Sequence, residues 1–443
     1  MAGRGRQSRA DPTDNPPRGF DMPRLSSLAR NLQAETAFTV LARARALKAQ
    51  GKDVVELEIG DSPFPSTPHA KAAGIRAIEE DRTGYGPSLG LADFRATAAR
   101  FVNAEFGLQV AAENVVVASG AKPFEQYFAE ALLDPGDGVL IFSPHFPTYV
   151  PNLERRGARA VLVPLAAEDG FRPRASDVAN FLATDPRPRG VFLNSPHNPT
   201  GGVATAEDLG AIAAVVRGTD LQVFSDEPYC HMVWKGRHES ILGRPGMLDH
   251  VVAAYTFSKS YSMSGWRVGF AVAHPEVVEA IGKLINTSAS CSPPFVQWAA
   301  RAALEHDAPT RDDYMARYRR KVERLADGLA AIEGVRVVPP AGTFYVFPDV
   351  RAVCDRLGIT SHGLALYLLE GADDAFGVAC LGGESFGTAG AGFLRFSCAE
   401  PDDRIDQALA FLPVAFERLD RVRRFLDKHP RFALARPSRA DIG

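Results

Sequence analysis

Residues 251–273 read VVAAYTFSKSYSMSGWRVGFAVA, two apolar runs (251–258 and 267–273) joined by a polar loop. Both runs are rich in β-branched and aromatic residues, which is typical of strands. Their residues are mostly apolar at successive positions and do not alternate with polar ones, which favours strands covered on both faces. Lys259 directly follows the first run, and Arg267 lies between two glycines at the start of the second. The stretch therefore predicts two buried strands with a lysine at the end of the first.

Five more apolar runs precede this stretch, at residues 115–119, 139–143, 160–165, 191–195 and 221–227. Helical patterns accompany them, for example at 123–133, 205–218 and 275–288. Strands that alternate with helices predict an α/β fold, with a mostly parallel seven-stranded sheet covered by helices on both faces. Such sheets bind ligands beyond the carboxyl ends of their strands. We therefore expect the functional residues just after the apolar runs.

The two ends of the chain predict a smaller α+β domain. Its expected elements are helices at 26–51, 319–334 and near 401–427, and strands at 54–60 and 393–399. The expected boundaries are a disordered tail at 1–22, an arm and part of the small domain at 23–61, the large domain at 62–318, the rest of the small domain at 319–433, and a loose tail at 434–443. Both tails are rich in polar residues, arginine and proline, and therefore bury little surface.

Composition narrows the class of protein. The 443 residues are 46% apolar and 23% charged, with a net charge of −3, which is ordinary for a globular enzyme and argues against nucleic-acid binding as the main role. The five cysteines contain no CxxC pair, which indicates free thiols in a reducing compartment. No apolar run approaches the roughly 18 residues that cross a bilayer, and no signal peptide is visible. We therefore expect a cytoplasmic protein with no membrane partner.

Three further polar motifs follow apolar runs. SGAKP (119–123) places small residues at the start of a helix, where backbone N–H groups and the positive helix end can bind an anion. NSPHNPTGG (194–202) holds Asn198 between prolines, which fix the backbone around its amide. SDEPY (225–229) ends a strand with Asp226, and a buried carboxylate at that place needs a partner, such as a protonated ring nitrogen.

Each motif also has an ordinary structural explanation when it is taken alone. The first fits a tight turn, the second a polar surface turn, and the third a helix cap or a surface ion pair. Lys259 fits a surface lysine whose stem lies along apolar residues. In contrast, a lysine amine can form an imine with an aldehyde, and Thr256, Ser258 and Arg267 can bind a phosphate. The apolar run before Lys259 makes the surface explanation the weaker one.

Together and in this order, the motifs resemble those of the class I/II pyridoxal-phosphate-dependent aminotransferases, the aspartate aminotransferase superfamily, over roughly residues 55–430. The lysine pattern of this family, S/T-x-S-K followed by G-x-R-x-G, is matched by Thr256, Ser258, Lys259, Gly265, Arg267 and Gly269. Its pattern N-x-P-x-N-P-T-G is matched by Asn194, Pro196, Asn198, Pro199, Thr200 and Gly201, and its Asp-x-x-Tyr by Asp226 and Tyr229. Each pattern is modest alone, but the ordered set is specific.

The resemblance implies pyridoxal 5'-phosphate as cofactor, held by Lys259 as a Schiff base, with further catalytic roles for Asp226 at the ring nitrogen and Tyr229 at the ring's phenolic oxygen. The residues implied in cofactor binding are Tyr85, Gly120, Ala121, Lys122, Phe146, Asn198, Asp226, Tyr229, Thr256, Lys259 and Arg267. Those implied in substrate binding are Gly60, Asn198 and Arg395, the last as a clamp on the α-carboxylate. Tyr85 matches a tyrosine that reaches the phosphate of the neighbouring subunit, which implies a homodimer with shared active sites.

The implied function is transfer of an amino group from an α-amino acid to a 2-oxo acid, in ping-pong half-reactions through the Lys259 Schiff base. The alternative is another reaction of the same cofactor: a lyase, racemase, cyclopropane-forming synthase or oxidase. A regulator with a degenerate domain of this family is a third possibility, but it requires a DNA-binding domain for which residues 1–25 are too few. Aspartate, aromatic and alanine-type donors all stay open. No metal site is expected, because no HExxH pair is present.

Overall fold

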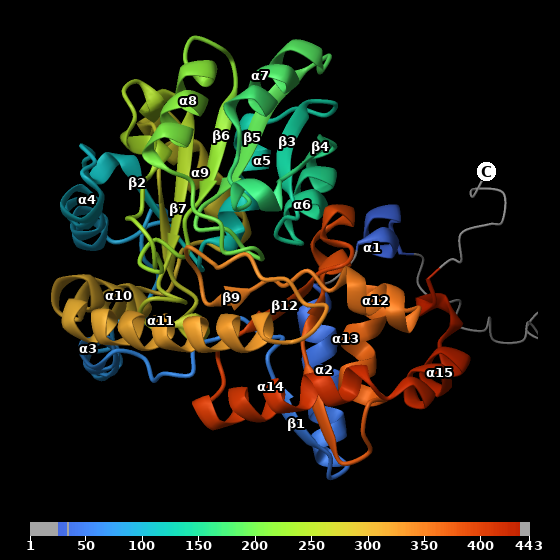
Figure 1. Cartoon of the computed structure of the whole chain (residues 1–443). Coiled ribbons are helices and arrows are strands. Elements are labelled where there is room, and N and C mark those ends of the chain that lie inside the picture. The colour runs from blue at the N-terminus through green and yellow to red at the C-terminus, as the bar shows by residue number, and fades with distance from the viewer. Residues whose placement is uncertain (1–24, 33–34, 435–443) are drawn as a thin grey trace, which may run out of the picture. The chain divides into compact units, whose positions relative to one another are not determined.

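The structure is a computed structural model that describes residues 25–32 and 35–434 (Figure 1). The predicted tails lie outside the described residues, except for Leu434. The chain divides into two compact units, Met1–Ala34 and Glu35–Gly443. In the first unit, Ser27–Asn31 forms the short helix α1, and the Ser26 hydroxyl accepts a hydrogen bond from the backbone N–H of Ala29 at 3.1 Å. All further elements belong to the second unit.

A seven-stranded sheet organises the middle of the chain, with the order β2-β8-β7-β6-β5-β3-β4. Its strands are β2 (Val115–Ala118), β3 (Gly138–Ser143), β4 (Arg159–Pro164), β5 (Pro188–Asn194), β6 (Gln222–Asp226), β7 (Val251–Thr256) and β8 (Gly269–Val272). The strands β4, β3, β5, β6 and β7 are parallel to one another, and β8 is antiparallel to both β7 and β2. The predicted α/β fold with a mostly parallel sheet of seven strands is confirmed.

Both faces of the sheet are covered by helices. Successive residues of β5 show this, because Val191 and Leu193 belong to one buried cluster and Phe192 to another. The first cluster includes apolar residues of α4 (Ala92–Phe106), α7 (Ala175–Thr184), α8 (Ala206–Val216) and α10 (Pro294–His306), and α3 (Pro68–Glu79) packs on α10. The second includes residues of α5 (Lys122–Leu132), α6 (Tyr149–Arg156) and α9 (Pro275–Ser288). Continuous apolar runs are what a strand between two such layers requires.

The strand β4 departs from this pattern. None of its six residues is fully buried, and Leu162 is 44% exposed. The strand β4 lies at the edge of the sheet and pairs only with β3, but the edge position alone does not explain its exposure, because β2 at the opposite edge is buried throughout. For β4, the prediction that the apolar run forms a strand covered on both faces is therefore wrong.

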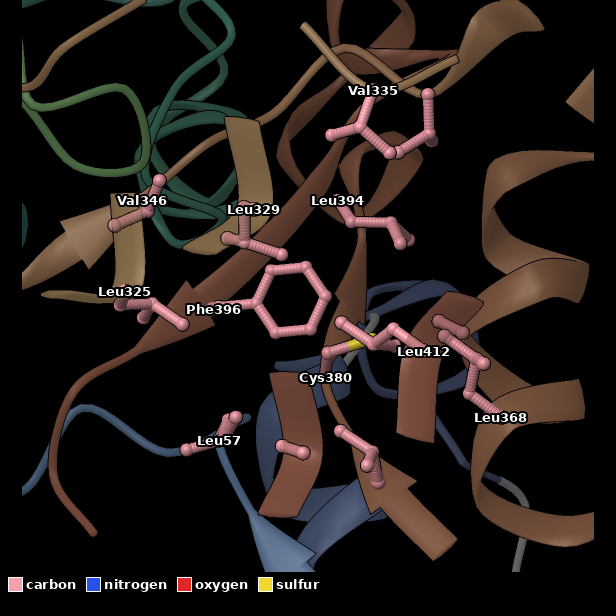
Figure 2. Close-up of a cluster of buried hydrophobic side chains, with 14 of the residues drawn as sticks. Leu57, Leu325, Leu329, Val335, Val346, Leu368, Cys380, Leu394, Phe396 and Leu412 are labelled. Carbon is pink, nitrogen blue, oxygen red and sulfur yellow. The ribbon is translucent and has the colours of Figure 1, made fainter. Parts of the chain in front are cut away.

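The two ends of the chain share a second core. The strand β1 (Asp53–Glu56) pairs in parallel with β10 (Phe376–Ala379), and β12 (Leu394–Ser397) pairs with β11 (Leu381–Gly382) and β9 (Tyr345–Val346). Figure 2 shows side chains from both ends of the chain in one cluster, which contains Leu57 as well as Leu412. The helices around these strands are α2 (Thr36–Ala49), α11 (Ala308–Ala330), α12 (Arg351–Leu357), α13 (Ser361–Glu370), α14 (Asp402–Phe416) and α15 (Leu419–Lys428). The exact division into a large and a small domain stays a prediction.

Three predicted helices have other bounds in the structure. The pattern at 26–51 is two helices, α1 and α2, and the helix near 401–427 is also two, because Arg418 leaves the helical conformation with φ −84° and ψ 62°. The helix predicted at 319–334 begins eleven residues earlier, at Ala308. Its first half buries Arg311, Tyr314, Met315 and Tyr318 at helical spacing, a face that its many charged residues conceal in the sequence. None of the described helices is long and apolar enough to cross a membrane.

Candidate active site

Three neighbouring strands end at the same edge of the sheet and place the predicted residues there. In the register of the sheet, Asn194 at the end of β5 lies beside Asp226 at the end of β6. The next strand, β7, ends at Thr256 and leads directly to Lys259. The carboxyl ends of parallel strands meet at one edge, so residues more than sixty positions apart share a single region.

Asp226 is buried at this edge, and one side chain of the described residues donates to its carboxylate. The Tyr149 hydroxyl, from the first turn of α6, donates to Asp226 Oδ2 at 2.6 Å. Burial raises the pKa of Asp226 to about 6, and the Tyr149 hydrogen bond opposes this rise. Burial also raises the pKa of the Tyr149 hydroxyl well above its usual value, so Tyr149 remains a donor. The remaining oxygen of the carboxylate is thus available to a cationic partner.

Lys259 is half-buried and makes its hydrogen bond to backbone. Its Nζ donates to the carbonyl oxygen of Gly60 at 2.5 Å and lies 5.5 Å from the centre of the Phe344 ring. Gly60 has no room for a side chain, since a Cβ there would lie 1.9 Å from the Tyr345 hydroxyl oxygen. Within the described residues, no carboxylate forms an ion pair with this amine. The lysine is therefore available to a ligand.

A chain of polar contacts connects the strand ends to the second core. Asn198 Nδ2 donates to the Tyr229 hydroxyl at 3.4 Å, and the Tyr229 hydroxyl donates to that of Tyr345 at 3.3 Å. Arg395, on β12, donates to Asn198 Oδ1 at 3.1 Å and to the carbonyl oxygen of Glu58 at 2.5 Å. Its guanidinium also lies 4.2 Å from the Tyr345 ring centre. Arg395 is buried, and it forms no ion pair with a carboxylate of the described chain.

Arg267, Thr256 and the turn before α5 form a cationic and hydroxyl-rich region. Arg267 Nη2 donates to the carbonyl oxygen of Ser119 at 2.9 Å, at the start of α5. Gly120 has φ +101°, and a Cβ there would lie 2.7 Å from Arg267 Nη2, so only glycine allows this close approach. Thr256 Oγ1 donates to Ser258 Oγ at 3.0 Å. A guanidinium whose acceptors in the described part of the chain are all backbone oxygens, a helix N-terminus and two hydroxyls suit an anion such as a phosphate.

Comparison with known proteins decides the family. The family described as aminotransferase class I and II matches residues 52–412. The chain belongs to this aminotransferase family. A probable aspartate/prephenate aminotransferase of Aquifex aeolicus is 33% identical, over 89% of this chain and 99% of that protein. The arginine–pyruvate transaminase of Pseudomonas aeruginosa is 34% identical, over 82% of this chain and 91% of that protein.

Solved aminotransferase structures share the fold. The aspartate aminotransferase of Thermus thermophilus with maleate has a TM-score of 0.82 and 32% identity, over 89% of this chain and all of that one. The aspartate aminotransferase of Rhizobium meliloti also has a TM-score of 0.82, with 29% identity over 90% of this chain. The predicted resemblance and fold class are therefore confirmed. The chain is an aminotransferase, and the alternative reactions of the same cofactor are not favoured.

The other predicted residues of this aminotransferase take different positions. Phe146, in the loop after β3, packs edge-on against Tyr149 with ring centres 5.8 Å apart. Lys122, the first residue of α5, forms an ion pair with Glu35 and lies 5.1 Å from the Phe146 ring centre. Tyr85 is 92% exposed and has none of the contacts that join the other residues. Its predicted place beside a neighbouring subunit stays a prediction.

Some residues of the aminotransferase site were not predicted. Tyr149 and Tyr345 were not singled out in the sequence, and only the structure shows that they contact Asp226 and Tyr229. Glu58 was not singled out in the sequence. Both oxygens of its carboxyl group are buried and have no hydrogen-bond partner among the described residues, and its backbone carbonyl accepts a hydrogen bond from Arg395. Burial raises the pKa of Glu58 to about 7. A polar residue two positions before Gly60 was the only signal in the sequence.

Proposed function

We propose that this aminotransferase uses pyridoxal 5'-phosphate and moves an amino group from an α-amino acid to a 2-oxo acid. One observation carries the proposal. An amine (Lys259), a buried carboxylate (Asp226) and a buried guanidinium (Arg395) without an acidic partner among the described residues lie in one region of the structure. Arg395 binds Asn198, Asn198 binds Asn194, and Asn194 binds the backbone of Asp226, whereas Lys259 and Arg395 bind the backbone of the same segment at Gly60 and Glu58. Each of these three groups fits one part of the reaction: the cofactor's aldehyde, its ring nitrogen and the substrate's carboxylate.

The described residues fit the cofactor. Asp226 keeps an oxygen free for a protonated ring nitrogen, since its one side-chain hydrogen bond is to Tyr149. Arg267, Thr256 and the backbone at Gly120, Ala121 and Lys122 form a cradle for a phosphate. Gly120 supports this most directly, because any larger residue there would occupy the cradle. Phe146 lies near enough to Tyr149 and Lys122 to pack against a ring held by Asp226.

When it is bound, the cofactor supplies an electron sink for the charge that develops at the substrate Cα. Lys259 would hold its aldehyde covalently, and its amine, once released, would carry a proton between the substrate Cα and the cofactor carbon that had been the aldehyde. Asp226, as the carboxylate, would keep a proton on the ring nitrogen. Tyr229 and Asn198 would donate hydrogen bonds to the ring's phenolic oxygen. Arg395 would orient the substrate by binding its α-carboxylate in two places.

An amino-donor screen tests this function. The full chain with added cofactor is mixed with aspartate, arginine, phenylalanine or alanine, and the change of the bound cofactor from its aldehyde to its amine form is read by absorbance. Stoichiometric glutamate should form when 2-oxoglutarate is then added, because the two half-reactions are separate. Release of ammonia without glutamate, for every donor that reacts, would contradict the proposal. The relatives named above make aspartate and arginine the first two donors to try.

Arg395→Lys tests the substrate role of the guanidinium. We expect KM for the amino donor to rise by about 10- to 100-fold, since a lysine cannot bind a carboxylate with two parallel hydrogen bonds. Steady-state kinetics of the loaded enzyme measure this, with Arg324→Lys as the control, because Arg324 forms an exposed ion pair with Asp406 on the surface. An unchanged KM in Arg395→Lys would show that another residue binds the carboxylate.

We also propose a homodimer in which Tyr85 reaches the partner's phosphate site. The support is the 92% exposure of a tyrosine side chain in a chain taken alone. Tyrosine is enriched at interfaces between proteins, which fits this position. The cytoplasmic location stays a prediction from the five free cysteines.

A further inference from the structure

A second buried acid, Glu125, lies on the α5 side of the site and has no role in the function described above. It stands in the first turn of α5 and is 2% exposed. Its carboxyl group accepts two hydrogen bonds, from Thr148 Oγ1 at 2.5 Å and from Asn152 Nδ2 at 2.9 Å. Both bonds end on Oε2. Acidic side chains are seldom buried unless they are paired, so a buried acid held by two specific donors indicates a role in this region.

The donors to Glu125 connect it to Asp226. Thr148 is the N-cap residue of α6, and the next residue, Tyr149, donates its hydroxyl to Asp226 Oδ2 at 2.6 Å. Thr148 therefore binds Glu125, and the next residue, Tyr149, binds Asp226. Any shift of the turn that carries Thr148 also moves the Tyr149 ring, which is buried and packs against Phe146. Through this turn, the hydrogen bonds of Glu125 fix the donor of Asp226.

The charges around Glu125 favour its neutral form. The groups that act on it are Asp226 from β6, Tyr149 from α6 and Lys122 from its own helix, and Lys122 already forms an ion pair with Glu35. Burial first and the charge of Asp226 second raise the pKa of Glu125 to about 8, against the opposing effects of Lys122 and of the hydrogen bonds from Thr148 and Asn152. The pKa of Asp226 is lower, at about 6. Two carboxylates buried so close to each other do not both ionise readily, so the proton stays on Glu125.

We propose that Glu125 is a positioning residue that acts on Asp226 through Thr148 and Tyr149, and that it does so as the neutral acid. Because Oε2 accepts both hydrogen bonds, Oε1 carries the proton. Asp226 is then the one charged carboxylate of these two. Its orientation is fixed by the hydrogen bond from Tyr149, whose buried ring is held by packing. The inference rests on the proposed role of Asp226 at the ring nitrogen.

The protonation of Glu125 is tested without cofactor or activity. The thermal unfolding midpoint of the full chain is measured from pH 5 to pH 10 for the wild type and for Glu125→Gln, an uncharged side chain of the same size. A carboxyl group with a raised pKa stabilises the fold at low pH, and this stabilisation is lost as the pH rises from the unfolded pKa toward the folded pKa. The midpoint of the wild type relative to Glu125→Gln should therefore fall by about 2 °C per pH unit between pH 5 and about pH 8, and stay constant above.

The control for this measurement is Glu130→Gln, on the same helix. Glu130 accepts a hydrogen bond from Gln126 at an exposed position, so its midpoint difference from the wild type should not change with pH in this range. A constant difference for Glu125→Gln as well would show that Glu125 is charged in the folded protein and would overturn the inference. Since cofactor is absent, this result is independent of whether the proposed function holds.

The positioning role is tested in the loaded enzyme. Glu125→Gln should keep kcat near pH 7 within about threefold, whereas Glu125→Leu, which accepts no hydrogen bond, should lower kcat by about tenfold with little change in KM, the scale known for outer-shell partners. The pH at which the absorbance of the bound cofactor changes should shift in the leucine variant only. If that variant does not fold, Thr148→Val serves instead, as it removes one donor and leaves the acid. The role would be refuted if Glu125→Gln and Glu125→Leu lowered kcat equally. It would also be refuted if neither Glu125→Leu nor Thr148→Val lowered kcat.

Discussion

Replacing Lys259 with alanine is expected to lower kcat on the order of 10⁵-fold, the scale seen when a covalent catalytic residue is removed. The side chain is half-buried and its hydrogen bond goes to one backbone oxygen, that of Gly60, so the fold loses little when it is removed. Far-ultraviolet circular dichroism and the unfolding midpoint should therefore stay close to those of the wild type. Loss of activity with an intact fold is the signature of a residue that takes part in the reaction.

The covalent role of Lys259 can be read directly. The wild type with added cofactor should be yellow, and borohydride should fix the cofactor to Lys259, as peptide mass analysis would show. In Lys259→Ala both the colour of the covalent form and the fixed label should be lost. Lys283→Ala is the matched control, since Lys283 is an exposed lysine on α9. A label on another lysine of the wild type, or normal turnover of Lys259→Ala, would remove the basis of the proposed function.

The sheet and the position of Lys259 could be predicted from the sequence because their causes are local. A strand between two helical layers must be apolar at every position, and β3, β7 and β8 each show this in a continuous run. A lysine directly after such a run must leave the sheet at its carboxyl edge, which is where an α/β fold binds ligands. The resemblance then required only the order of the motifs. The exposure of β4 was less predictable, since its apolar run resembles those of the buried strands.

The contacts around Asp226 could not be predicted because they depend on distances between elements. Tyr149 lies 77 residues before Asp226 in the chain, and only the packing of α6 against the sheet brings its hydroxyl to 2.6 Å from the carboxylate. Glu125 looks like an ordinary charged residue of a helix, yet it is on the buried face between Phe124 and Phe128. A buried acid shows itself in a sequence only when its partners are known, and here they are Thr148 and Asn152 on another helix.

Asp226→Ala is expected to lower kcat by about 10³-fold, equivalent to about 4 kcal/mol of transition-state stabilisation. The carboxylate is the buried acid nearest to the proposed ring position, and without it the ring nitrogen would lose its proton and with it much of the electron sink. The substitution also leaves the Tyr149 hydroxyl buried without its acceptor, which lowers stability by about 1–3 kcal/mol. Steady-state kinetics with saturating cofactor, together with an unfolding curve, separate the two effects.

Asp226→Asn isolates the charge from the packing. Asparagine has nearly the same shape and can still accept the hydrogen bond of Tyr149, but it cannot stabilise a positive charge on the ring nitrogen. We therefore expect stability close to that of the wild type and a loss of kcat that approaches that of Asp226→Ala. Glu227→Gln is the neighbouring control: Glu227 is buried too, but it binds Ser225, Ser240 and His238, so its loss should affect stability far more than kcat. If Asp226→Asn keeps most of the activity while Glu227→Gln loses it, the acid that pairs with the ring nitrogen is Glu227, and the assignment of this role to Asp226 is wrong.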